Sequence, residues 1–172
     1  MPASEEPDTD IRTRLVERRD AEALRAIYNV EVLESTVTFD LRPRTPAEQL
    51  AWIDEHSGGH PAIVAVDARD VPVGFASLTP YRPRPAYSTS VEDSVYVHRD
   101  LRGRGLGRLL LGELVDLARD HGFHCMIGRV VGDHDASIAL HASLGFEQVG
   151  REREIGRKFN RWLDVVTMQK ML

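Results

Sequence analysis

The part of the sequence best suited to chemistry is a turn rich in glycine and arginine at residues 102–107. An alternating strand pattern, Val95-Tyr96-Val97, precedes it, and leucines at helical spacing follow it. Such a turn leaves backbone N–H groups uncovered beside a helix N-terminus, and that combination attracts phosphate. Four arginines add countercharge: Arg99, Arg102, Arg104 and Arg108. The sequence therefore predicts a site for a phosphorylated cofactor.

Three phosphate-binding patterns compete for this turn, besides a plain connection between strand and helix. A nucleotide P-loop ends in Gly-Lys-Ser/Thr, but Arg108 and Leu109 follow Gly107, which excludes it. A dinucleotide fingerprint starting at Gly103 would need its third glycine at Arg108, and it needs an acid about 20 residues on. Residues 123–125 contain no acid, so this pattern fits poorly.

The pattern that fits is Arg-x-x-Gly-x-Gly, filled by Arg102, Gly105 and Gly107. It resembles the pyrophosphate-binding motif of the GNAT superfamily of acetyl-CoA-dependent N-acetyltransferases. The resemblance implies acetyl-CoA as cosubstrate, with no metal.

Composition limits the class of protein and of partner. The 172 residues suit one domain, with residues 1–10 as a disordered acidic tail and 11–172 as the folded unit. The net charge of −5 argues against nucleic acid as a partner, and no apolar run approaches the length of a membrane span. The single cysteine, Cys125, and the lack of an apolar leader favour the cytoplasm.

Hydrophobic periodicity and capping signals place strands and helices in alternation, which predicts an α/β fold on a mixed sheet. Asp20 is expected to cap the first helix, and Thr45-Pro46 to start the second. The expected strands are 12–16, 62–66, 73–78, 90–97, 126–131, 146–154 and 165–170. The first expected helix begins at residue 20, and the other three cover residues 46–56, 105–121 and 136–144.

This order is similar to that of the GNAT fold, a mostly antiparallel sheet of about seven strands with about four helices. Several runs resemble the phosphinothricin N-acetyltransferase group within it. They include Tyr81-Arg82-Pro83-Arg84-Pro85-Ala86-Tyr87, Val91-Glu92-Asp93-Ser94-Val95-Tyr96-Val97 and Ser137-Ile138-Ala139-Leu140-His141. The resemblance implies transfer of acetyl to the α-amine of L-phosphinothricin, methionine sulfoximine or methionine sulfone in a ternary complex. It also implies a homodimer.

Acetyl transfer to an amine needs a base for the amine and an acid for the departing thiolate. The resemblance places Glu92 as the base; periodicity alone would make it an exposed strand carboxylate. His141 stands where many GNAT enzymes have the tyrosine that protonates the thiolate, and imidazole suits that task. A half-buried histidine bonded to backbone is the alternative.

The remaining cofactor contacts also follow from the resemblance. The backbone of Val95, Tyr96 and Val97 would bind the pantetheine amides, with a Val97 N–H at the thioester oxygen. Ser137 would contact the pantetheine arm. His134 replaces the asparagine usual in the family and offers one donor only, so we expect a weaker contact. The pyrophosphate would be bound by residues of the glycine turn: Arg102, Gly103, Arg104, Gly105, Leu106, Gly107 and Arg108.

The resemblance also implies that a loop rich in arginine and aromatic residues forms the substrate wall. Arginines suit a carboxylate or phosphinate, and an aromatic floor suits a short chain. A solvated basic loop is the alternative. The loop contributes Arg82, Arg84 and Tyr87, and the other predicted substrate-binding residues are Phe39, Glu92 and Ser94. The pairs His56/His60 and His121/His124 have no further ligand nearby in sequence and predict no metal site.

Two other functions remain open at the level of sequence. An acetyltransferase for protein N-termini or lysines would need an open groove, whereas the Arg82/Arg84 loop favours an acidic small molecule. A non-catalytic acyl-CoA sensor would have lost Glu92 and His141, and both are present.

Overall fold

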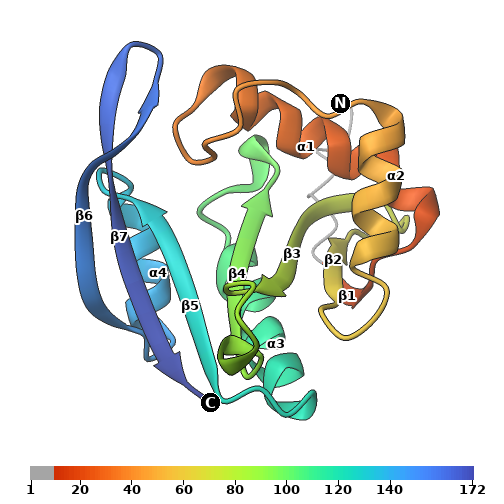
Figure 1. The fold of residues 1–172 in the computed structure, drawn as a ribbon. Helices are drawn as coiled ribbons and strands as arrows, with labels where there is room; N and C mark the ends of the chain where they lie inside the picture. The colour runs from red at the N-terminus through yellow and green to blue at the C-terminus, as the bar shows by residue number, and fades with distance from the viewer. Residues whose placement is uncertain (1–9) are drawn as a thin grey trace.

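One open sheet organises residues 10–172, the part of the chain that the computed structural model describes (Figure 1). Its strand order is β1-β2-β3-β4-β5-β7-β6, and only β4 and β5 run parallel. The mixed, mostly antiparallel sheet that we predicted is therefore confirmed. The strands are β1 (Arg12–Leu15), β2 (Ala62–Val66), β3 (Pro72–Pro80), β4 (Ser90–Val97), β5 (Cys125–Val131), β6 (Glu147–Lys158) and β7 (Arg161–Met171).

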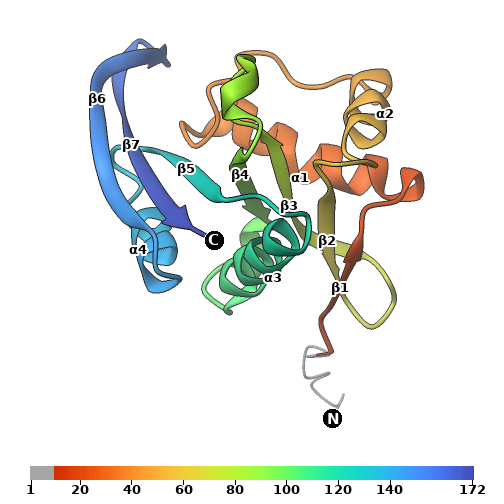
Figure 2. The same ribbon diagram turned by 60° about the horizontal axis from the view of Figure 1, so that its bottom comes forward.

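Four α-helices within the described residues cover the two faces of the sheet. They are α1 (Ala21–Glu34), α2 (Pro46–Glu55), α3 (Leu106–Asp120) and α4 (Asp135–Ser143). In Figures 1 and 2, α1 and α2 lie on one face, and α3 and α4 lie on the other. None of these helices is long and apolar enough to cross a membrane.

The buried face of α3 forms the larger part of the core. Leu110, Leu111 and Leu114 are fully buried against strand residues such as Leu78 and Met126. A second cluster lies on the opposite face, where α1 packs Leu24 and its neighbours onto the sheet. Since burying one such side chain contributes about 1.5–3 kcal/mol, these two clusters fix both helices on the sheet.

The helix starts differ in part from expectation. Thr45 caps α2 as predicted, because its hydroxyl accepts from the Glu48 N–H (3.2 Å) and Glu48 accepts from the Thr45 N–H (2.8 Å). Asp20 is the N-cap residue of α1 as predicted, but its side chain does not form the expected cap bond. Its buried carboxylate instead accepts from Arg14 and from the Glu17 N–H, and it makes no cap bond to α1.

The pairing between β4 and β5 ends halfway along β4. Residues Ser90 to Asp93 pair with Cys125 to Gly128, and beyond Asp93 the two strands diverge, as Figure 1 shows. Within the described chain, Ser94 to Val97 stay paired only with β3. The outward N–H and C=O groups of this segment therefore have no partner strand along one edge.

Strands β6 and β7 form a hairpin longer than predicted. Its turn is at Phe159 and Asn160, both with positive φ, and the strands continue well past the expected boundaries at 154 and 165. The missed residues are 155–158 and 161–164, and their sequences, Ile-Gly-Arg-Lys and Arg-Trp-Leu-Asp, lack the apolar alternation of a strand. In Figure 1 the hairpin rises beside the loop that follows α1.

Candidate active site

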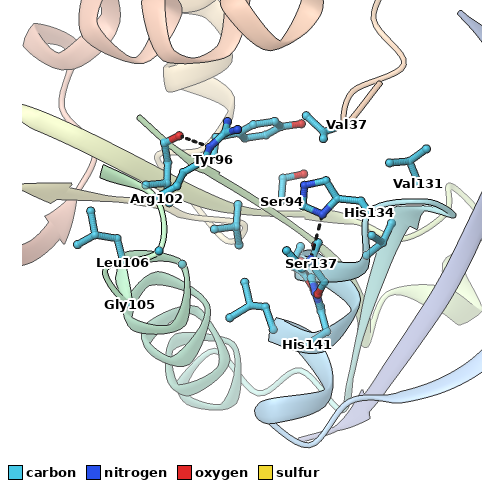
Figure 3. A pocket seen from close by; sticks show the side chains of 18 of the residues that line it. Val37, Ser94, Tyr96, Arg102, Gly105, Leu106, Val131, His134, Ser137 and His141 are labelled. Carbon is cyan, nitrogen blue, oxygen red and sulfur yellow. Dashed lines mark hydrogen bonds and ion pairs between the residues drawn. The ribbon is translucent and has the colours of Figure 1, made fainter. Parts of the chain in front are cut away.

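A cavity of about 440 Å³ lies where β4 and β5 diverge. The starts of α3 and α4 close one side of it, so Gly105 and Leu106 face His134 and Ser137 across the opening (Figure 3). It brings together most of the predicted cofactor residues. Those that line it are Val95, Tyr96, Val97, Arg102, Gly103, Gly105, Leu106, Gly107, His134 and Ser137.

The glycine turn has the conformation that a phosphate site needs. Gly103 and Gly105 have φ of 74° and 84°, a region that side chains other than glycine rarely adopt. Gly105 is the N-cap of α3, and a side-chain cap bond is absent there. The first N–H groups of α3 therefore point toward the cavity without internal partners, which suits pyrophosphate.

The arginine of the motif is fixed by a buried glutamate that the sequence analysis missed. Arg102 Nη2 donates to Glu31 Oε1 (2.7 Å) and Arg102 Nε donates to the Val97 carbonyl (3.3 Å). Arg99 Nε donates to the same Glu31 oxygen (2.8 Å). Burial raises the pKa of Glu31, but the bonds from Arg99, Ser35 and Arg102 outweigh this effect. The pKa is therefore lowered overall, and the carboxylate stays charged.

Arg104 and Arg108 are placed outside the cavity lining. Arg108 Nη1 donates to Ser143 Oγ (2.7 Å) and so ties α3 to α4, while Arg104 is exposed on the turn. Their predicted cofactor contacts stay predictions.

The first turn of α4 presents His134 and Ser137 to the cavity. His134 Nδ1 accepts from the Ser137 N–H (2.9 Å) and thereby caps the helix. In a neutral His134 the proton is then on Nε2, which leaves one donor for a ligand. His134, which we expected to weaken cofactor binding because it replaces an asparagine, thus caps α4 and still offers one N–H donor.

The deepest side chains of the site are His141 and Asp93, both buried. His141 Nε2 lies 3.0 Å from Asp93 Oδ1, and His141 Nδ1 donates to the Ser137 carbonyl (2.8 Å). The other Asp93 oxygen, Oδ2, has no partner among residues 10–172. Both residues line the cavity, so His141 lies there beside Asp93, which we had not singled out.

The Asp93–His141 pair requires a glycine behind it. A Cβ at Gly128 would lie 2.6 Å from His141 Nε2 and 3.2 Å from Asp93 Oδ2. Burial lowers the pKa of His141, but the hydrogen bond and charge of Asp93 and the Ser137 carbonyl outweigh it, so the pKa is raised.

Glu92 faces the opposite side of β4, because side chains alternate along a strand and Asp93 points to α4. It is half-buried and does not line the cavity that holds the cofactor residues. Burial raises its pKa; Asp93 and Glu152 act in the same direction, whereas Arg129 and Arg82 oppose it. A raised pKa brings a carboxylate closer to the range useful for a general base.

The predicted substrate wall is only partly assembled. Arg82 lies close enough to act on Glu92, and Tyr87 packs edge-on against Tyr81 with ring centroids 5.5 Å apart. Arg84 is exposed before the short turn at residues 85–87. Ser94 lines the cavity. Phe39 does not; its ring packs against β6, where a Cβ at Gly156 would lie 2.3 Å away.

Two charged residues of this face escaped the sequence analysis. Arg129 on β5 lines the cavity, and its guanidinium forms an ion pair with Glu152 on β6. A lone arginine within the apolar strand 125–131 was the available signal. Among the described residues, no group of three or more His, Cys, Asp or Glu side chains is arranged to hold a metal ion.

Comparison with known proteins places this geometry in context. The family model described as acetyltransferase (GNAT) family matches residues 24–146. A phosphinothricin N-acetyltransferase of Streptomyces coelicolor is 39% identical over 166 residues, covering 95% of this chain and 97% of the relative. An L-methionine sulfoximine/L-methionine sulfone acetyltransferase of Pseudomonas paraeruginosa is 41% identical over 151 residues, covering 87% of this chain and 88% of the relative.

A solved structure shows the same arrangement over most of the chain. The yncA acetyltransferase structure from Salmonella typhimurium, determined with its cofactor acetyl-CoA, superimposes with a TM-score of 0.92 at 36% identity. The match covers 95% of each chain.

Proposed function

The chain belongs to the acetyltransferase (GNAT) family and is an N-acetyltransferase, and from this we propose that it transfers acetyl from acetyl-CoA to the α-amine of a small amino-acid-like substrate. The acceptors are of the phosphinothricin, methionine sulfoximine or methionine sulfone type. One observation carries the proposal: the diverging β4 and β5 join a phosphate-binding glycine turn to a half-buried carboxylate, Glu92, on the other face.

The cosubstrate fits the residues present. Its pyrophosphate lies on the N–H groups from Gly105 to Gly107, between the starts of α3 and α4. The free edge of β4 from Ser94 to Val97 pairs with the pantetheine amides, as an added strand would. This places the thioester where β4 and β5 separate, beside Asp93.

The reaction then runs by direct attack in a ternary complex. Glu92 takes a proton from the substrate ammonium, directly or through water, and the free amine attacks the thioester carbonyl. The nitrogen gives its second proton to solvent as the amide forms, and Glu92 returns its own proton to solvent. An N–H near Val97 stabilises the oxyanion. As the C–S bond breaks, the thiolate takes the proton that Asp93 and His141 share, and solvent returns one to the pair. Both ring nitrogens of His141 are bonded, so the pair acts as one acid.

A homodimer is part of the proposal. Three large apolar side chains are exposed on the β6–β7 hairpin, Ile155 (58%), Phe159 (53%) and Trp162 (60%), and such a patch is typical of a protein interface. Replacement of Trp162 and Ile155 by glutamate should halve the mass measured by sedimentation equilibrium. An unchanged mass would contradict an interface at the hairpin.

The function is tested by release of free CoA thiol from acetyl-CoA with a panel of amines. The panel contains L-phosphinothricin, methionine sulfoximine, methionine sulfone, common amino acids and a lysine peptide. We expect turnover with the three tetrahedral-tailed amino acids. Turnover with the peptide alone would indicate a protein acetyltransferase. Acetyl-CoA binding without any turnover would indicate a sensor, and either result would overturn the proposed acceptor.

A further inference from the structure

Four charged side chains interact with one another beside the point where β4 and β5 diverge, and their formal charges cancel. Two are carboxylates, Glu92 on β4 and Glu152 on β6. Two are guanidinium groups, Arg129 on β5 and Arg82 beyond β3. The ion pair between Arg129 and Glu152 crosses β7, and Arg82 acts on both carboxylates. A neutral cluster of this kind accepts a zwitterion without leaving an uncompensated charge, whereas a simple alkylammonium adds one.

Of the two guanidinium groups, that of Arg129 belongs to the residue at the point where β4 and β5 separate. It follows Gly128, the last β5 residue that pairs with β4, so it stands where the two strands diverge. Ile127, two residues earlier, pairs with Glu92, which puts Arg129 and Glu92 on the same face of the sheet. Among the cations that act on Glu92, Arg129 has the strongest effect and Arg82 the next.

We propose that Arg129 is a specificity-determining residue that binds the α-carboxylate of the acceptor while its α-amine lies against Glu92. The inference rests on the function proposed above. In an α-amino acid the amine and the carboxylate share one carbon, so the cation for the carboxylate must stand beside the base. A guanidinium can bind a carboxylate through two parallel hydrogen bonds. Before substrate arrives, Glu152 holds Arg129 in place.

The test compares each acceptor with its carboxamide, which keeps the α-amine and removes the negative charge. Methionine sulfone and methionine sulfone amide are assayed with wild type, Arg129→Gln and Arg119→Gln. The wild type should prefer the acid by about 10- to 100-fold in kcat/KM, the range for a charge-assisted hydrogen bond. In Arg129→Gln this preference should fall to within about threefold, through KM for the acid, with KM for acetyl-CoA unchanged.

Arg119→Gln is the matched control, because Arg119 is exposed near the end of α3 and, within residues 10–172, forms an ion pair with Asp116 alone. It should keep the wild-type preference. Glu152→Gln, which frees Arg129, should lower KM for the acid two- to fivefold.

An unchanged acid-to-amide ratio in Arg129→Gln, with wild-type melting temperature, would overturn the assignment and leave the proposed function standing. Wild-type turnover confined to amines without an α-carboxylate, or no turnover, would overturn the proposed acceptor class together with this inference.

Discussion

Asp93 Oδ1 lies 3.0 Å from His141 Nε2, and this contact joins β4 to α4 at the point where β4 leaves β5. The Ser137 carbonyl accepts from His141 Nδ1, so that nitrogen keeps its proton. The only proton that the pair can exchange is the one between the ring and the carboxylate. The pKa of His141 is raised in consequence, and the pair stays protonated at a pH where free imidazole, with a pKa near ~6.5, has lost its charge.

We predict that Asp93→Asn shifts the basic limb of the pH–rate profile. An acid acts only below its pKa, so activity falls as pH rises through the pKa of the pair. Without Asp93 the burial of His141 lowers its pKa, and the limb should move to lower pH. We also expect kcat to fall about 10²-fold, measured by thiol release.

Asp100→Asn is the control for Asp93→Asn, because it removes the same charge from an exposed side chain (87%). It should leave the profile unchanged. A basic limb at the wild-type pH in Asp93→Asn would show that the pair is not the acid.

Replacement of Glu92 by glutamine should remove the acidic limb. Burial raises the pKa of Glu92, so wild-type kcat/KM should fall as pH drops through a value above the ordinary range for glutamate. Above that pKa we expect Glu92→Gln to be about 10²- to 10⁴-fold slower, and below it the two enzymes should converge. Glu113→Gln, at an exposed position of α3, is the control. An acidic limb that persists in Glu92→Gln would assign the base elsewhere.

A methyl group at Gly128 should displace the Asp93–His141 pair. Gly128→Ala places a Cβ within 2.6 Å of His141, so the Asp93–His141 pair must shift. We expect the free energy of unfolding to fall by about 1–3 kcal/mol and kcat to fall as in Asp93→Asn.

Gly112→Ala, within α3, is the contrasting variant, because nothing lies within 4 Å of its Cβ. Alanine favours helix over glycine by about 1 kcal/mol, so this variant should melt at or above the wild-type temperature. Equal activity and stability of both variants would contradict the close approach at Gly128.

Glu31→Gln tests whether the ion pairs of Glu31 with Arg99 and Arg102 position the glycine turn. Glutamine retains an oxygen acceptor but removes the charge that holds Arg99 and Arg102. We expect KM for acetyl-CoA to rise about tenfold while kcat changes less than twofold, since charged hydrogen bonds contribute about 1.5–3 kcal/mol. Glu34→Gln removes an exposed partner of Arg99 and should change KM little. An unchanged KM in Glu31→Gln would contradict the positioning role.

Much of the fold follows from local signals. The capping box at Thr45 and the leucine stripe of α3 are set by neighbours a few residues apart, so the sequence predicts them well. The extent of the β6–β7 hairpin does not follow from local signals. Its charged residues are held in strand by pairing with β7, a contact that periodicity does not record.

The sequence by itself determined the glycine turn, because only glycine adopts the φ of residues 103 and 105 at low cost and the next residues start a helix. The resemblance of neighbouring residues also singled out Glu92 and His141, whose roles stay predictions. Their partners were decided by tertiary structure. Asp93 meets His141 48 positions away, and Arg99 and Arg102 meet Glu31 across 68 and 71 positions. Such pairs arise because helices, strands and turns far apart in the sequence pack against one another, and ionic partners meet only when the folded chain brings them close.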